Sequence, residues 1–388
     1  MIGSYSGWLM GDGSLIIGNV LPMTSVSAAD STADPEREQQ LAAQAGLVVR
    51  NTEPLNCETP APLLGEDVTP TARFYRRSHF PVPVLDHEAW RLGIRGLVRE
   101  PLSLSLQQLT QLPAQTAVVT LECAGNGRSL FRPAAEGEQW GLGAVSTAEW
   151  TGVRLADVLH RAGIRGGARE VIFGGADRGP VNGSAVPVRF ERSLPLADAL
   201  DSGALLAYAM NGQPLPARHG APLRLIVPGW YAVASVKWLT DVEVVPEPFD
   251  GYFQASHYVY EWSRDGRTVR EPVRLQQVRA LITSPAAGQE AARDGLVVRG
   301  VAWSGAAPIV RVEVSVAGGL WRQARLAGAP APHGWQRWEL LVAGLERGET
   351  VIRARAADLA GRRQPEVPEW NRLGYAANFI HEVRVRLH

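Results

Sequence analysis

The sequence of 388 residues is poor in cysteine, in lysine and in net charge. It has two cysteines, Cys57 and Cys123, one lysine, Lys237, and 39 basic side chains balanced by 39 acidic ones. Two cysteines cannot form a disulfide framework or a four-cysteine zinc site. A neutral chain also lacks the basic excess typical of proteins that bind nucleic acid. No apolar run approaches the roughly 20 residues of a membrane span. We therefore expect a globular protein with no membrane span that binds no nucleic acid.

The first 30 residues contain neither lysine nor arginine, so the positively charged start of a secretory leader is missing. This favours the cytoplasm. A moderately apolar patch at residues 15–21, followed by small residues at 27–29, leaves an exported protein as the alternative.

The pattern along the chain predicts three parts. Residues 1–70 form an N-terminal extension and linker, with a helix that starts at Asp34-Pro35 and ends at Gly46, and a proline-rich connector at 54–70. Residues 71–260 mix short apolar strands, such as 118–121 and 223–227, with helical segments at 155–162 and 195–200.

From residue 275 to the end the hydrophobic period becomes two. Residues 310–316, 351–356 and 383–387 alternate apolar and polar side chains, and turns rich in Gly and Pro separate them. This pattern is typical of an antiparallel β-sandwich. Residues 261–275, rich in Arg, Glu and Gly, are predicted to be the linker between the two domains.

The segment Leu121-Glu122-Cys123-Ala124-Gly125-Asn126-Gly127-Arg128 carries the first chemical signal. A cysteine at the end of an apolar run, before a glycine-rich turn, lies where backbone N–H groups can converge. Arg128 would favour the thiolate. Taken alone, a single cysteine is more often a small buried apolar residue than a reactive one.

Two further segments gather positive and donor groups. Tyr75-Arg76-Arg77-Ser78-His79 precedes a proline-bounded loop, and guanidinium groups match the geometry of oxyanions. Residues 211–239 bring His219, Arg224 and Lys237 to one edge of the predicted strand. The alternative for the first segment is a basic loop exposed to solvent. The alternative for His219 is a loop histidine whose hydrogen bonds are made within the protein and which binds no ligand.

Together these motifs resemble the sulfite oxidase family of molybdopterin enzymes. Cys-Ala-Gly-Asn-x-Arg is similar to the family's molybdenum-cysteine motif, and Arg77-Ser78-His79 to its Arg-Asn-His motif. Residues 205–238 are similar to its cofactor-binding signature. Residues 254–258 resemble the segment that carries its active-site tyrosine, and residues 358–375 resemble its dimerisation domain. The similarity extends over residues 71–388.

The resemblance implies an α+β fold: a sulfite oxidase-type mixed α/β molybdopterin domain followed by an immunoglobulin-like β-sandwich. It implies that Cys123 binds molybdenum. It places in the substrate pocket Arg77, Arg128, Trp140 and Tyr258, with Arg337 as the arginine contributed by the C-terminal domain. It assigns to the binding of the pterin and its phosphate Tyr75, Ser78, His79, Asp177, His219, Arg224, Ser235 and Lys237. The alternative for Lys237 is that it has no such role and is simply the lysine that remains in a sequence whose codon bias favours arginine.

The implied reaction is oxidation of sulfite to sulfate by oxygen-atom transfer. No Cys-x-x-Cys-His haem-attachment motif occurs and no haem domain fits into the first 70 residues, so we expect no haem. Electrons would then pass to a separate acceptor, with a cytochrome c as one candidate, and the family implies a homodimer. The alternatives are the same cofactor acting on another sulfur compound or oxyanion, as a sulfoxide reductase or a sulfur-intermediate dehydrogenase, and a non-catalytic binding protein.

Overall fold

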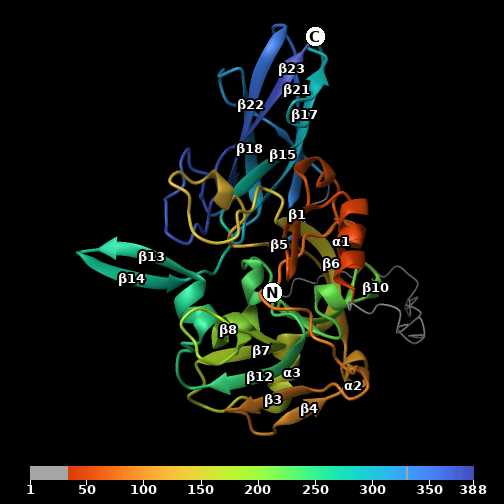
Figure 1. Ribbon diagram of the computed structural model, residues 1–388, viewed down its shortest axis with the longest axis vertical. Coiled ribbons are helices and arrows are strands. Elements are labelled where there is room, and N and C mark those ends of the chain that lie inside the picture. Colours follow the sequence, from red (N-terminus) through yellow and green to blue (C-terminus); the bar gives the residue numbers. More distant parts are fainter. Residues whose placement is uncertain (1–33, 329–330) are drawn as a thin grey trace, which may run out of the picture. The chain divides into compact units, whose positions relative to one another are not determined.

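The computed structural model describes residues 34–328 and 331–388 (Figure 1). Helix α1 (Pro35–Gln44) begins as the sequence predicts, because the Asp34 carboxylate accepts hydrogen bonds from two backbone N–H groups of its first turn. Gly46 follows its end with a left-handed backbone. The apolar patch at residues 15–21 that suggested a leader lies outside the described residues.

The predicted connector at 54–70 is in part a strand. Strands β1 (Val48–Thr52) and β2 (Leu55–Glu58) form an antiparallel hairpin, and a short 3-10 turn follows at Ala61–Leu63. The prolines had suggested irregular chain throughout. They instead bound β2, since Pro54 lies in the turn before it and Pro60 follows it.

An ion pair ties α1 to the segment that follows this hairpin. The Arg76 Nη1 atom lies 2.7 Å from the Glu38 Oε2 atom, and the Arg218 Nη1 atom lies 3.9 Å from Glu38 Oε1. One carboxylate of the N-terminal helix thus faces two arginines from distant parts of the chain.

The first large domain contains two five-stranded sheets. The order of the first is β10-β9-β6-β5, with β11 paired to β9, and its strands are β5 (Ala114–Glu122), β6 (Val145–Arg154), β9 (Leu205–Met210), β10 (Gln213–Pro214) and β11 (Arg224–Ile226). The order of the second is β4-β3-β12-β7-β8, and its strands are β3 (Leu92–Gly96), β4 (Leu102–Leu104), β7 (Glu170–Gly179), β8 (Val188–Pro195) and β12 (Leu239–Val245).

Short helices pack against these sheets: α2 (Leu106–Thr110), α3 (Leu155–Ala162) and α4 (Leu196–Asp201). Helix α3 has the bounds that the sequence predicts, because its buried side chains recur at helical spacing and Gly163 ends it with a left-handed backbone. Among the described residues, no helix is both long enough and apolar enough to cross a membrane.

The segment 261–275, predicted to be a linker, is largely a β-hairpin. A π-helix (Phe253–His257) leads into β13 (Val259–Arg264), which pairs antiparallel with β14 (Arg267–Pro272). Asp265 and Gly266 both have positive φ, as a two-residue type I′ turn requires. The Asp-Gly pair was the signal for this hairpin.

The C-terminal domain is the predicted immunoglobulin-like sandwich of two sheets. One sheet has the order β15-β17-β21-β20, with strands β15 (Arg279–Ser284), β17 (Leu296–Trp303), β20 (Arg325–Ala327) and β21 (Gln336–Val342). The other has the order β16-β23-β22-β18-β19, with strands β16 (Glu290–Ala291), β18 (Ile309–Val316), β19 (Arg322–Gln323), β22 (Gly348–Asp358) and β23 (His381–Leu387). Alternate side chains of β23 are buried, as the period of two predicts.

The sandwich packs directly against the strand that leads to the predicted cysteine loop. Trp303 and Leu281 from the sandwich form one buried cluster with Val145 of β6. The Gln276 amide donates hydrogen bonds to the carbonyl oxygens of Thr120 and Trp230. Both domains therefore fix the end of β5.

Candidate functional site

Cys123 is the first residue after β5, at the start of a tight loop. Its backbone N–H donates to Ala144 O at 2.9 Å, and its own carbonyl accepts from Asn126 N–H at 2.9 Å. Gly127 has φ +86°, and a Cβ there would lie 2.8 Å from Ala377 O, so no other residue fits easily. The sulfur is therefore held in a rigid turn between two domains.

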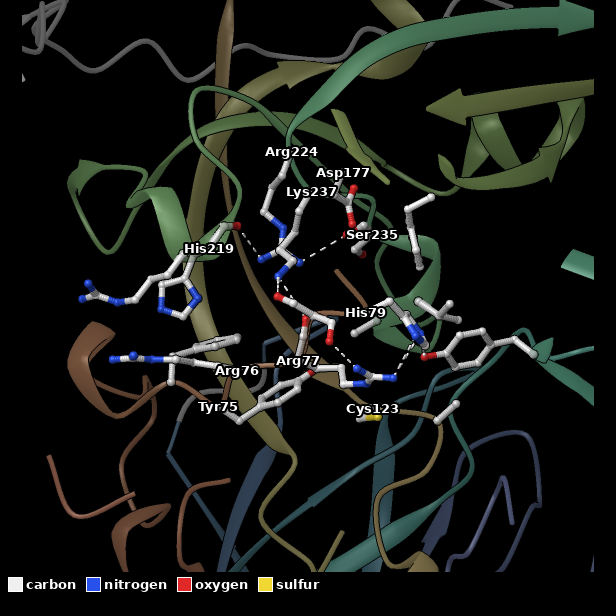
Figure 2. Close-up of a pocket in the computed structure, with 18 residues that line it drawn as sticks. Tyr75, Arg76, Arg77, His79, Cys123, Asp177, His219, Arg224, Ser235 and Lys237 are labelled. Atoms are coloured by element: carbon white, nitrogen blue, oxygen red, sulfur yellow. Dashed lines mark hydrogen bonds between the residues drawn. The ribbon is translucent and has the colours of Figure 1, made fainter. Parts of the chain in front are cut away.

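Two cavities meet at Cys123. The inner cavity, of about 70 Å³, and the outer cavity, of about 600 Å³, share the lining residues Arg77, His79, Cys123 and Tyr258. Figure 2 shows the inner one, with Arg224 and Lys237 facing Arg77 across it and the Cys123 sulfur near its lower edge.

The inner cavity collects all the residues that the sequence assigned to the cofactor. Its lining includes Tyr75, Ser78, His79, Asp177, His219, Arg224, Ser235 and Lys237. They come from the segment before β3 and from β7, β11 and the loops on either side of β11. The fold thus unites three separate stretches of the chain, at residues 75–79, 177 and 219–237.

One end of the inner cavity is strongly basic. Lys237 Nζ donates to Ser78 Oγ at 2.6 Å and to Arg77 O at 3.0 Å. Arg224 donates from Nη1 to His219 O at 2.9 Å and from Nη2 to Ser235 O at 3.2 Å. Backbone carbonyls and the Ser78 hydroxyl align these donors, and the Asp177 carboxylate belongs to the same lining.

Burial works against these charges. It lowers the pKa of Lys237, with Arg224 acting in the same direction, and it lowers the pKa of Arg224 to about 10. Burial raises the pKa of the Asp177 carboxyl. A dianion bound here would offset the cost of burying these positive charges, because it would supply negative charge beside Lys237 and Arg224.

Several buried polar atoms at this end have no partner within the described residues: Asp177 Oδ1, His219 Nε2 and Arg224 Nε. Unpaired buried polar atoms are costly and point to a missing ligand or water. The donor set fits the phosphate of a pterin cofactor, and Asp177 and His219 fit its ring nitrogens and amine. Lys237 reaches across the inner cavity to Ser78 Oγ and Arg77 O, so a tricyclic ligand requires the Lys237 side chain to turn.

Arg77, His79 and Tyr258 form a hydrogen-bonded chain beside the thiol. Arg77 Nη2 lies 3.0 Å from His79 Nδ1, and His79 Nε2 lies 2.8 Å from the Tyr258 hydroxyl. Arg77 Nη2 also lies 3.2 Å from His79 Nε2, so the tautomer of the neutral ring decides which of its nitrogens accepts from the arginine. Burial, reinforced by Arg77, lowers the pKa of His79 and keeps it neutral. With the hydrogen on Nε2 the ring donates to the Tyr258 hydroxyl, and with the hydrogen on Nδ1 the hydroxyl donates to the ring.

Burial raises the pKa of the Cys123 thiol, while Arg77 and Arg128 act in the opposite direction. A soft metal ion would remove the proton outright. In the described part of the chain no three His, Cys, Asp or Glu side chains cluster as a metal site. A metal at Cys123 would therefore take its remaining ligands from a cofactor or from solvent.

The outer cavity contains the predicted substrate residues Arg77, Arg128, Trp140 and Tyr258. Arg128 is buried and already engaged: Nε donates to Leu373 O at 2.9 Å and Nη1 to Glu138 O at 2.8 Å. Within residues 34–328 and 331–388 the indole N–H of Trp140 has no partner. Trp140 and the Nη2 group of Arg128 therefore keep hydrogens that can meet a substrate oxygen.

Arg337, by contrast, lines neither cavity. It lies on β21, where its Nε atom donates to Asp67 at 2.6 Å. The sequence could not separate it from Arg372, which belongs to the same domain and does line the outer cavity. Arg372 is paired with Glu136 at 2.7 Å and with Glu261 at 2.8 Å. We therefore replace Arg337 by Arg372 among the candidate site residues.

Other lining residues were not predicted from the sequence. In the outer cavity they include His257 and Tyr375, and in the inner cavity Arg76 and Arg218. His257 precedes Tyr258 and Arg76 precedes Arg77, so adjacency to a motif was the available signal for both. Burial and three nearby arginines lower the pKa of His257 to about 4.

Two family matches cover most of the chain: the oxidoreductase molybdopterin binding domain over residues 79–253 and the Mo-co oxidoreductase dimerisation domain over residues 271–388. With the basic inner cavity and its thiol, these matches define a molybdopterin-dependent oxidoreductase.

Relatives identify the family more closely. The chain is 38% identical to mitochondrial sulfite oxidase of Homo sapiens over 95% of this chain and 71% of that protein. It is 32% identical to sulfite oxidase of Arabidopsis thaliana over 91% and 97%. The chain therefore belongs to the sulfite oxidase family. The crystal structure of the sulfane dehydrogenase SoxCD from Paracoccus pantotrophus has a TM-score of 0.77, with 27% identity and 97% of both chains covered.

Proposed function

We propose that the protein oxidises sulfite to sulfate at a molybdenum-pterin cofactor bound to Cys123. The observation that carries this proposal is the meeting of the two cavities at one thiol. The cofactor residues surround the inner cavity, the substrate residues line the outer one, and Cys123 belongs to both. Sulfite oxidase relatives over nearly the whole chain support the substrate.

When bound, the cofactor supplies two-electron oxygen-atom transfer. The chain's own residues hold it and orient the substrate. The Cys123 thiolate binds the metal, Lys237 and Arg224 bind the phosphate, and Arg77 places positive charge beside the thiol.

The substrate would lie in the outer cavity, against the shared wall. The Tyr258 hydroxyl and the Trp140 N–H donate to its oxygens, and Arg77 and Arg128 attract the dianion. This would leave the sulfur lone pair directed toward the metal.

The overall reaction converts sulfite and water into sulfate, two protons and two electrons. The electrons must leave the cofactor for a separate acceptor, and a one-electron carrier such as a cytochrome c accepts them in two steps.

The match to the dimerisation domain supports a homodimer as the working assembly. Light scattering of the purified protein tests it, and a monomer at micromolar concentration would contradict it. For the compartment we keep the cytoplasm, which fractionation of cells that produce the protein would test.

The outer cavity supports a second candidate, a sulfur atom carried on a larger molecule. About 600 Å³ is far more than sulfite requires, and Glu53, Glu136 and Glu138 line it together with the arginines. Carboxylates beside the substrate disfavour a free dianion. The similar structure of a sulfane dehydrogenase supports this candidate too.

The test uses purified enzyme with measured molybdenum and pterin content. Reduction of ferricyanide is followed with sulfite and, in parallel, with glutathione persulfide as a carrier-bound sulfane. Sulfite turnover that disappears in Cys123→Ser supports the first proposal. Full molybdenum content with persulfide turnover and no sulfite turnover would replace it by the second, and full molybdenum with neither activity would refute both.

A further inference from the structure

Glu122, the residue immediately before Cys123, has its carboxylate completely buried between the two domains. Three donors surround it: Arg279 Nη1 at 2.8 Å, Trp303 Nε1 at 2.9 Å and Asn126 Nδ2 at 3.0 Å. Two of these donors come from the C-terminal sandwich, and the third belongs to the cysteine loop itself.

Arg279, the first residue of β15, is as deeply buried as its partner, with 2% of each side chain exposed. Besides Glu122 it contacts the Asn126 carbonyl at 3.3 Å and donates to Ala377 O. It therefore binds the residue that precedes the cysteine and a residue within the loop that follows it.

Asn126 connects these contacts to the thiol. Its side chain donates to Glu122 and accepts from Ala144 N–H at 3.1 Å, and its backbone N–H donates to Cys123 O. The charged pair thus contacts the loop at both ends, beside the backbone hydrogen bonds that the N–H groups of Cys123 and Gly127 donate to Ala144 O and Gly141 O.

A buried ion pair is a poor way to gain stability, because desolvation costs roughly what the attraction returns, and an apolar pair of similar volume is often as good. What it provides is geometry, since each partner demands a directed set of hydrogen bonds. Neither side chain lines either cavity, so the pair contacts the site through the loop, and the Glu122 charge acts besides to raise the pKa of the Cys123 thiol.

We infer that Glu122 and Arg279 are positioning residues through which the sandwich domain fixes the Cys123 sulfur for its metal. The role of Cys123 as a metal ligand rests on the proposed function; the restraint of the loop does not. Loss of the pair would leave a folded domain whose cysteine loop opens more often.

The test compares the paired variant Glu122→Gln/Arg279→Gln with the parent. Removing both charges avoids leaving one buried charge unpaired, which by itself would be strongly destabilising. The control is Asp358→Asn/Arg362→Gln, since that pair has a buried carboxylate, lies at 2.8 Å within the sandwich and does not touch the loop.

The main readout is alkylation of cofactor-free protein by iodoacetamide, followed at the Cys123 and Cys57 peptides by mass spectrometry. Cys57 is fully buried in the N-terminal cluster and serves as the internal control. We expect the Cys123 rate to rise about tenfold in the paired variant, because each factor of ten corresponds to about 1.4 kcal/mol of local opening. The Cys57 rate and the control variant should match the parent.

The second readout is the half-life of bound molybdenum on dialysis, which should shorten about tenfold in the paired variant alone. An unchanged Cys123 rate, or an equal rise in the control variant, would overturn the inference and leave the pair a matter of stability. A parent that binds no molybdenum would refute the proposed function, while the alkylation rates would still decide the restraint.

Discussion

Lys237 offers the sharpest test of the basic end of the inner cavity. The change is Lys237→Met, which keeps the length of the side chain and removes its ammonium group. Two hydrogen bonds disappear, to Ser78 Oγ and Arg77 O, at about 1 kcal/mol each. Repulsion from Arg224 and Arg77 disappears as well, and so does the attraction to Asp177. These effects oppose one another, so we expect the cofactor-free protein to change in stability by less than about 2 kcal/mol.

Binding of the cofactor should respond very differently. If Lys237 neutralises the phosphate, its loss costs about 2–5 kcal/mol, which weakens binding by roughly 30-fold to several thousand-fold. The assay is pterin fluorescence and elemental molybdenum in purified protein after exhaustive dialysis, next to urea unfolding of the cofactor-free form. Arg189→Met is the control, because Arg189 is a part-buried cation of the same domain that lines neither cavity and pairs with Asp241.

Undiminished cofactor content in Lys237→Met would refute the assignment of this residue to the phosphate. Equal losses of cofactor in Lys237→Met and Arg189→Met would refute it too, since a general loss of stability would then explain both.

Three other changes test the site and its scaffold. Cys123→Ser should abolish bound molybdenum and turnover while the circular dichroism spectrum stays that of the parent; retained molybdenum would contradict the ligand assignment. His381→Gln should remove about 1 kcal/mol of the stability that the parent loses between pH 6.5 and 5.5 in urea unfolding. Its folded pKa is lowered to about 4 by burial, so the neutral ring stabilises the fold above the unfolded value near 6.5, and that stability is lost as the pH falls; an unchanged pH dependence would contradict this. Gly143→Ala should lower the melting temperature strongly, because its Cβ would lie 2.0 Å from Thr59 O, and a melting temperature like the parent's would contradict the close approach.

The sequence predicted those helices and strands well whose hydrophobic period and end signals lie within the segment itself. Helix α3 and strand β23 have the expected positions because hydrophobic period and end signals lie within the segment itself. The hairpin β13–β14 was missed because its charged residues suggested a linker, although the Asp265-Gly266 turn was present in the sequence.

The site residues that lie within the sequence motifs could be predicted. Cys123 and the residues assigned to the cofactor surround one cavity. Arg337 and Arg372 show the limit: both are arginines of the sandwich, and only tertiary packing decides that Arg372 reaches the outer cavity while Arg337 pairs with Asp67. The Glu122–Arg279 pair could not be predicted either, since a carboxylate beside the cysteine gives no sign of which distant residue meets it.

The ion pair between Glu38 and Arg76 bears on how the protein can be divided for experiments. Arg76 and Arg218 both line the inner cavity, and α1 supplies the carboxylate that faces them. A recombinant fragment trimmed to residues 79–253 would omit this helix together with Tyr75, Arg77 and Ser78. A shortened protein intended to carry the cofactor must therefore start no later than Asp34 and must include the sandwich.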